Sequence, residues 1–414
     1  MNRWQDRTAR TLLWLVLIFL GRAVVGAEPY ESYYRFVGNY PDEDKPVYHE
    51  ECQGITHDDQ YWYITNKWTI WKFHVTDNLR NDSERDLKQL SSVSDLAGYE
   101  HLGDPSYYYY KDGSQGYLLI PVEDDERDLT PVLAVFRSND LGYVGKAVLN
   151  GHSDAACCAV DPKGTVYIPN GGTIGGIREY RLNWGLLHTN KVELQSLPDF
   201  YFYDELTDPL WLKDMQGAVV SESGERLYVV CGNADDVDAS YGIHVFDMRT
   251  QMRVARSSRS SLPFRYEWHP GWSRYEEPEG ITIWDLDDKG APGISGQLHV
   301  LLLDNEASNN DDVYLKHYTG TIYVNGKHVG SEEGTIDEPY TRIAQAISYY
   351  GTYAFWTGAR IKIQAGSYPE PCTFSKPVQV LSRGGTATFG SNGRVSISGS
   401  AAINISDEGT LIVH

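Results

Sequence analysis

Three short segments of this chain begin alike, and their repetition limits the possible folds more than any single motif does. Gln53-Gly54-Ile55, Gln216-Gly217-Ala218 and Glu279-Gly280-Ile281 each place a side-chain carbonyl group, then glycine, then an apolar residue at the start of a β-rich stretch. Two related openings begin near positions 101 and 154. The spacing of these openings is roughly the 40 to 50 residues of a propeller blade plus longer loops. The repeat therefore predicts a β-propeller of about five blades.

The rest of the first 318 residues fits this all-β architecture. Short runs rich in Tyr, Trp, Val and Ile alternate with turns that contain Gly, Asp and Asn, which is typical of many short strands. Residues 33–38 form a further expected strand, which would close the ring by pairing with the last blade. The aromatic stretch 183–215 is either a sixth, partial blade or an insertion. We predict that the propeller occupies residues 28–318.

The sequence pattern changes after position 318. Apolar residues at Ile343, Ala346 and Ile347 have helical spacing and predict a helix over residues 341–350. Four later apolar runs begin at 361, 378, 395 and 411, a nearly constant step that indicates stacked parallel strands. The prediction for residues 319–414 is a short right-handed parallel β-helix with 341–350 as its helical cap. Its open edge at 395–414 would favour pairing with a second copy of the chain.

The first 27 residues differ from the rest in composition. Arg3, Arg7 and Arg10 precede the apolar run 12–20, and Val25-Gly26-Ala27 provides small residues suited to cleavage. This order is typical of a secretory signal peptide and is short for a membrane span. We therefore expect a secreted protein, extracellular or periplasmic, with no membrane span in the mature chain. An uncleaved N-terminal anchor is the alternative.

The charge of the chain restricts its partners. The formal net charge is −21, and removal of residues 1–27 would make the chain more acidic. Nucleic acids and anionic membranes would be repelled, whereas neutral glycans, cationic partners and divalent metals would not. Of the five cysteines, the adjacent Cys157 and Cys158 are expected to be buried thiols on an inner strand.

Part of the C-terminal region resembles a known family. Ile322-Tyr323-Val324, the box from Pro339 to Ile343, and the strand–Gly–x–Tyr run from Ile361 to Tyr368 carry the likeness. They resemble the N-terminal region of bacterial right-handed β-helix proteins with the pectin-lyase-like fold. The resemblance implies the fold and not a lyase activity, because the acidic sites of family lyases would sit on rungs that this chain does not have.

A second, shorter resemblance concerns the propeller. The box Pro278-Glu279-Gly280-Ile281 is similar to blade openings in calcium-dependent lactonases, nucleotidases and phytase-like esterases. The resemblance implies a calcium-dependent hydrolase as one function for this chain.

The inner-strand openings supply candidate metal ligands, because they converge on the central channel of a propeller. Gln53, Asp104, Gln216 and Glu279 offer two carboxylates and two amide oxygens, which suit Ca²⁺. His101 is the candidate catalytic base beside them. The alternative is that these polar groups bond inner-strand backbone or channel water.

Aromatic residues in the predicted loops supply candidate ligand-binding positions. Aromatic residues cluster at Tyr107–Tyr110, at Tyr201-Phe202-Tyr203 and at Tyr266, Trp268, Trp272 and Tyr275, more densely than strand alternation needs. Exposed Tyr and Trp stack well on sugars or anchor proteins, so Tyr108, Tyr266, Trp268 and Trp272 are the candidate ligand-binding residues. The alternative is packing between blades. The leading hypothesis is an exported recognition module that binds an extracellular glycan or surface protein through these loops. The calcium-dependent hydrolase of phosphoesters, lactones or glycosides is its main alternative, and a purely structural spacer is the third.

Overall fold

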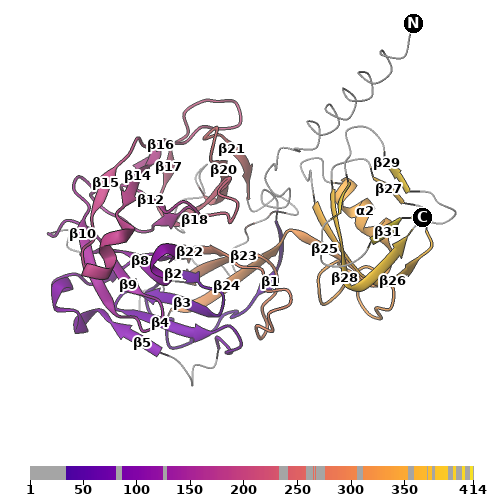
Figure 1. Ribbon diagram of the computed structural model, residues 1–414, viewed down its shortest axis with the longest axis horizontal. Coiled ribbons are helices and arrows are strands. Elements are labelled where there is room, and N and C mark those ends of the chain that lie inside the picture. The colour runs from indigo at the N-terminus through magenta and orange to yellow at the C-terminus, as the bar shows by residue number, and fades with distance from the viewer. Residues whose placement is uncertain are drawn as a thin grey trace, which may run out of the picture.

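The protein is described here from a computed structural model, in which a larger part made of antiparallel sheets precedes a smaller part with parallel strands (Figure 1). The described residues are 34–80, 86–124, 128–232, 241–257, 264, 266, 276–304, 311–352, 359–370, 372–374, 378–389, 395–397, 403–405 and 411–413. The predicted signal peptide, Trp268 and Trp272 lie outside them. Within the described residues, no helix is both long enough and apolar enough to cross a membrane.

The larger part is a five-bladed β-propeller. Blade 1 contains β2 (Cys52–His57), β3 (Tyr61–Asn66), β4 (Thr69–His74) and β5 (Asp86–Gln89). Blade 2 contains β6 (His101–Leu102), β7 (Ser106–Tyr110), β8 (Gln115–Glu123), β9 (Val132–Arg137) and β10 (Tyr143–Val148). Blade 3 contains β11 (Ala159–Val160), β12 (Thr165–Ile168), β14 (Gly176–Leu182), β15 (Leu194–Ser196) and β16 (Phe200–Tyr201). Blade 4 contains β18 (Met215–Val220), β19 (Arg226–Cys231), β20 (Gly242–Asp247) and β21 (Arg253–Arg256).

Blade 5 joins the two ends of the propeller. It contains β22 (Glu276–Ile283), β23 (Leu298–Asp304), β24 (Asp312–Thr319) and, as its outermost strand, β1 (Arg35–Asn39). The β1 strand pairs antiparallel with β24, with Arg35 opposite Thr319 and Phe36 opposite Tyr318. Backbone hydrogen bonds between the first and last strands thus close the ring, and the closing strand predicted near residues 33–38 is confirmed.

The stretch 183–215 is an insertion on blade 3. It contributes β15 and β16 to that blade, and its β17 (Leu212–Lys213) pairs with β13 (Thr173–Ile174) in a separate two-stranded sheet. A stack of Phe202 on Phe246, with ring centroids 4.7 Å apart, anchors the insertion against blade 4. The insertion builds a wall beside the propeller instead of a further blade.

Large aromatic side chains fill the wedges between blades. Tyr266 is fully buried in a core cluster with Tyr228 of blade 4 and Tyr318 of blade 5. Tyr108 packs on Trp184 at a centroid distance of 4.1 Å in the cluster between blades 2 and 3. The structure thus has both side chains in the alternative role of packing between blades, with Tyr266 fully buried and Tyr108 partly buried, and their ligand-binding roles stay predictions.

All five cysteines are buried free thiols, as expected for Cys157 and Cys158. Burial raises the pKa of both neighbouring thiols well above the ordinary value. The protein therefore gains its stability from packed sheets and not from cross-links.

The smaller part contains a parallel sheet and one helix. The sheet contains β25 (Thr321–Val324), β26 (Ala359–Tyr368), β28 (Val378–Phe389), β30 (Ile403–Ile405) and β31 (Leu411–Val413). A second parallel pair contains β27 (Cys372–Phe374) and β29 (Val395–Ile397), and the helix is α2 (Ile343–Thr352). Ile343 and Ala346 of α2 pack on Ile322, Ile361 and Val380 of the sheet. A complete right-handed β-helix, and its pairing through residues 395–414, stay predictions.

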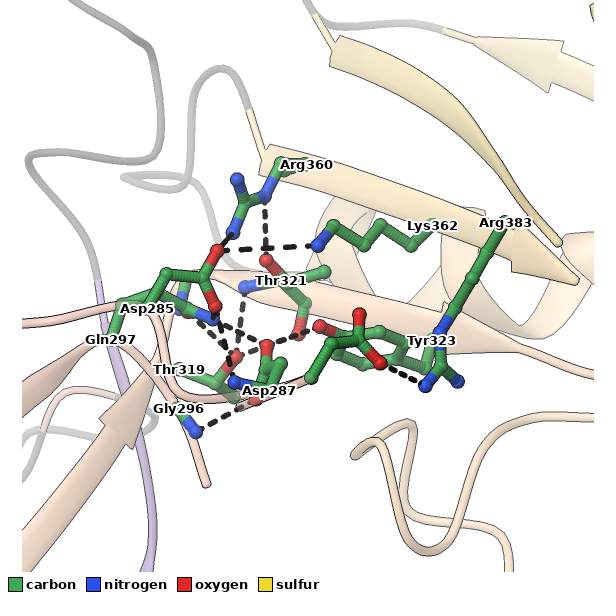
Figure 2. A network of polar contacts seen from close by, with 12 residues as sticks. Asp285, Asp287, Gly296, Gln297, Thr319, Thr321, Tyr323, Arg360, Lys362 and Arg383 are labelled. Atoms are coloured by element: carbon green, nitrogen blue, oxygen red, sulfur yellow. Dashed lines mark hydrogen bonds and ion pairs between the residues drawn. The ribbon is translucent and has the colours of Figure 1, made fainter. Parts of the chain in front are cut away.

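A polar network connects the two parts (Figure 2). Arg360 of β26 donates from Nη2 to Oδ2 of Asp285 at 3.0 Å, and from Nε to the Thr321 hydroxyl at 2.7 Å. Asp285 belongs to the loop after β22, and the neighbouring Asp287 accepts hydrogen bonds from the Gly296 backbone at 2.7 Å and from the Tyr323 hydroxyl. Burial works against ionisation of Asp285, but the charges of Arg360 and Lys362 hold its pKa below the ordinary value.

We expect Asp285→Ala to weaken this junction by about 1–2 kcal/mol, because it leaves the buried guanidinium of Arg360 without its carboxylate. The side chain of Arg360 is 9% exposed and that of Asp285 is 42% exposed, so solvent screens part of the effect. Asp288→Ala is the matched control, since the Asp288–Arg383 pair is more exposed and should matter little. Thermal unfolding and protease cleavage near residue 320 measure the change. The contribution of Asp285 should also be lost as the pH falls through its lowered pKa, since protonation removes the carboxylate.

Candidate functional site

One buried carboxylate connects the inner strands at the propeller axis. The Asp104 carboxylate accepts the backbone N–H of Ile55 at 2.9 Å, that of Ala218 at 3.2 Å, and that of Ile281. The backbone N–H of Asp104 donates to the carbonyl of Ala156 at 2.8 Å. These partners lie on or beside the inner strands of blades 1, 4, 5 and 3. Asp104 of blade 2 therefore bonds to all four other blades.

The glycines of the repeated openings allow this arrangement. A Cβ atom on Gly54 would lie 2.3 Å from the Cα of Asp104, and one on Gly217 would lie 3.1 Å from its Oδ2. A Cβ on Gly280 would lie 2.8 Å from both Asp104 Oδ1 and the Cα of Gly54. Only a residue without a side chain fits at such separations. The repeat seen in the sequence is thus a set of close backbone approaches around one carboxylate.

The four predicted calcium ligands are divided between the propeller axis and the channel mouth, and their metal-binding role stays a prediction. Burial raises the pKa of Asp104 well above its ordinary value, while its three backbone donors act in the opposite direction. Gln53 and Gln216 line a pocket at the channel mouth that Asp104 and Glu279 do not line. Among the described residues, no group of three or more His, Cys, Asp or Glu side chains could hold a metal ion. The Asp104 carboxylate is instead hydrogen-bonded to the backbone of the inner strands, which is the alternative role considered for it.

The channel mouth forms two adjoining polar pockets at the starts of the inner strands. The first has a volume of about 250 Å³ and is lined by Gln53, His101, Gly103, Glu123, Asp124, Asp154, Ala156 and Gln216. The second has a volume of about 200 Å³ and includes Asp214, Met215 and Glu277 in its lining. Asp154, Ala156 and Gln216 belong to both. The mouth thus brings His101 together with several carboxylates. The sequence predicted the position of His101 at the channel but not these carboxylates.

A carboxyl pair lies next to these pockets. Glu279 is 2% exposed, and its side chain hydrogen-bonds to that of Glu277, which lines the second pocket. Burial, and then the charge of Glu277, raise the pKa of Glu279 well above the ordinary value. A raised pKa makes a carboxyl group hold its proton more readily, which is the direction that a general acid needs.

A larger cleft lies beside the mouth, on the blade 3 insertion. It has a volume of about 480 Å³, and Gly171 and Ile174 belong both to this cleft and to the second mouth pocket. Trp211 and Tyr201 stand in its wall and are 61% and 53% exposed. The Trp211 ring covers Gly175, where a Cβ atom would lie 3.3 Å from the ring. We call this the blade 3 cleft.

The floor and the rim of the blade 3 cleft differ in chemistry. Ile177 and Phe202 are buried beneath it and make the floor apolar. Arg178 and Asp199 add charged groups to the lining, and Arg178 is held by hydrogen bonds to the carbonyls of residues 150 and 151 at 3.2 and 2.9 Å. An apolar surface with a few fixed polar groups is typical of small-molecule sites.

The chain was compared with known protein families, curated proteins and solved structures. No protein-family model matches the chain, and no curated protein matches it. Among solved structures it is similar to the tail fiber of Staphylococcus aureus phage P68, at 16% identity over 73% of this chain, with a TM-score of 0.38. The chain spans only 56% of that tail fiber. It is also similar to the GH43_1 enzyme from Xanthomonas citri complexed with xylose, at 14% identity over 66% of this chain and 88% of that chain, with a TM-score of 0.41. These likenesses concern the fold alone.

The sequence indicated the aromatic cluster Tyr201-Phe202-Tyr203 of the blade 3 cleft, but it did not indicate Trp211 or the cleft itself. Trp211 and Tyr201 fall in the stretch 183–215, where strands of two or three residues show no alternation. The aromatic cluster Tyr201-Phe202-Tyr203 was therefore the sequence signal for this region, and Trp211 stands alone in the sequence. The predicted ligand residues Trp268 and Trp272 lie outside the described residues and stay predictions.

Proposed function

We propose that this protein is an exported recognition module that binds a glycan in the blade 3 cleft. The observation that carries the proposal is the exposure of Trp211 and Tyr201 in the wall of a cleft with an apolar floor. Aromatic rings pack against the apolar faces of sugars. Packing within the protein leaves the rings of Trp211 and Tyr201 more than half exposed, and exposed apolar surface of this kind is typical of binding sites. Arg178, Asp199 and Asn170 supply hydrogen-bonding groups for hydroxyls at the rim.

Two further expectations belong to this proposal. Residues 1–27 would direct export, which the basic and apolar order of that segment supports. The parallel strands β25, β26 and β28 would be the first rungs of a right-handed β-helix, which their parallel register supports. In that arrangement the C-terminal part would be a structural support, and the propeller would contain the binding site.

We expect Trp211→Ala to reduce glycan binding at least tenfold, because it removes the largest exposed ring of the cleft. Trp68→Ala is the matched control: Trp68 is also exposed, at 45%, but it belongs to the turn between β3 and β4 and does not line the cleft. Binding to a printed glycan array, followed by calorimetry with the best glycan, measures both variants. Equal losses in the two variants, or no loss in either, would contradict the proposal.

A hydrolase acting at the channel mouth is the second candidate function. The Glu277–Glu279 pair favours it, because Glu277 lines the second mouth pocket and is hydrogen-bonded to a buried carboxyl group, Glu279, whose pKa is raised by burial. A calcium ion in such an enzyme would need ligands other than the Asp104 carboxylate, which already accepts three backbone N–H groups. Release of new reducing ends from a bound glycan would favour this function, and recovery of the intact glycan would favour recognition alone.

A further inference from the structure

The channel mouth and the blade 3 cleft lie next to each other, because their pockets share lining residues. The second mouth pocket shares Gly171 and Ile174 with the cleft, and shares Asp154 and Gln216 with the first mouth pocket. A chain-like ligand lying on Trp211 would therefore extend over Gly171 and Ile174 towards the axis. The two ends of this path differ in chemistry, since the aromatic side chains lie at the cleft and the carboxylates lie at the mouth.

The mouth end of the path is strongly acidic. Glu123, Asp124 and Asp154 line the first mouth pocket, and Asp214 and Glu277 line the second. No Lys or Arg is among the described residues that line these two pockets. A pocket walled by one sign of charge concentrates the field and attracts a group of the opposite charge. A cationic group is thus favoured here, and an anionic sugar is disfavoured.

An independent observation also indicates a ligand at the mouth. The Gln53 side chain is 9% exposed and lines the first mouth pocket, yet it has no hydrogen-bond partner among the described residues. The Gln53 amide is not among the fully buried polar groups that lack a partner, so it opens into the pocket, where it can bond to a group that enters. Its carbonyl oxygen would accept a hydrogen bond from a group that enters the pocket. An ammonium group has three N–H donors and no acceptor, so it can bond to Gln53 and to the nearby carboxylates together.

We propose that the ligand is an oligosaccharide with free amino groups, stacked on Trp211 in the blade 3 cleft and with one sugar ammonium in the channel mouth. This inference rests on the proposed glycan-binding function and adds the chemical class of the glycan. Hydroxyl and N-acetyl counterparts of the same sugars would use the cleft without the charge-assisted contacts at the mouth.

A printed array that presents amino-sugar oligomers beside their N-acetylated and hydroxyl counterparts tests this directly. We expect the signal that depends on Trp211 to concentrate on the free-amine glycans, with an affinity about tenfold higher than for the N-acetylated partner in calorimetry. Asp154→Asn should remove most of this preference while the affinity for the N-acetylated oligomer is kept. Asp112→Asn, an exposed carboxylate in the turn after β7, is the matched control and should change neither.

The outcomes separate the two proposals. Signals that depend on Trp211 but show no preference for free amines, or a preference that Asp154→Asn leaves unchanged, would overturn the amino-sugar inference and leave glycan recognition in place. Absence of any signal that depends on Trp211 would overturn both. Gln53→Ala gives a second readout, since the preference for free amines should fall without loss of the signal that depends on Trp211.

Discussion

Replacing Asp104 by alanine should lower the free energy of unfolding of the propeller by about 4 kcal/mol, or prevent folding. The substitution leaves the buried N–H groups of Ile55, Ala218 and Ile281 without acceptors. Each unsatisfied buried donor costs about 1–3 kcal/mol, and Asp104 is fully buried, so these donors are shielded from bulk water in the native protein. The lower stability would appear as a lower midpoint of urea or thermal unfolding.

Two further variants keep this prediction testable if the alanine variant does not fold. Asp104→Asn retains one acceptor oxygen but directs an NH₂ group at a backbone donor, so it should cost about 1–2 kcal/mol. Asp204→Ala is the matched control, because Asp204 also accepts two backbone N–H groups, at 2.8 and 2.9 Å, but in an exposed loop. The expected order of loss is Asp104→Ala, then Asp104→Asn, then Asp204→Ala. An Asp104 variant that is no less stable than the Asp204 variant would refute the role of Asp104 in holding the blades together.

The propeller was predictable because its signals are local and repeated. The strand openings at Gly54, Gly217 and Gly280 recur with similar chemistry, and a strand that precedes the first blade, as predicted at residues 33–38, can pair with the last blade. Ring closure through β1 follows from these observations. The reason for each glycine was not predictable, because it depends on distances between positions more than 40 residues apart that only the closed ring brings together.

The candidate site was predictable only in part, since aromatic side chains look alike in sequence whether they bind or pack. Tyr266 and Trp211 both follow turn-rich segments, yet Tyr266 fills a wedge between blades and Trp211 stands in solvent. Burial of a ring depends on which blade lies next to it, and a single sequence does not contain that information. Polar residues at the inner-strand starts were easier to place, because a propeller directs all of them to one axis. His101, Gln53 and Gln216 were assigned to the channel on this basis, and they do line its mouth.

The stability of the axis and the binding site at its mouth are linked through the same strands. Gln53 comes directly before Gly54, and Gln216 directly before Gly217, so the backbone that approaches Asp104 also presents the two amides to the mouth. A change that separates the inner strands should therefore alter both stability and ligand binding. Substitution of one of these glycines therefore tests the packing at the axis more directly than substitution of a residue at the channel mouth.

Gly280→Ala should lower the free energy of unfolding by about 3 kcal/mol, although it adds a single methyl group. The new Cβ would lie 2.8 Å from the Cα of Gly54, the N of Ile55 and Oδ1 of Asp104, and two of these atoms are backbone. The backbone atoms cannot rotate away, so blades 1 and 5 must separate. Gly185→Ala is the matched control, because its nearest atom would be 3.7 Å away; it should change stability by no more than about 0.5 kcal/mol.

Combining Gly280→Ala with Asp104→Ala distinguishes a clash at the axis from a general loss of stability. The double variant removes the Asp104 oxygen that the new Cβ would meet, so part of the strain is relieved. Residues in contact show interaction energies of about 0.5–3 kcal/mol in such cycles. We therefore expect the double variant to lose less stability than the two single variants lose together, whereas Gly185→Ala with Asp104→Ala should be additive. Additivity in both pairs would mean that Gly280 and Asp104 do not meet at the axis as the structure places them.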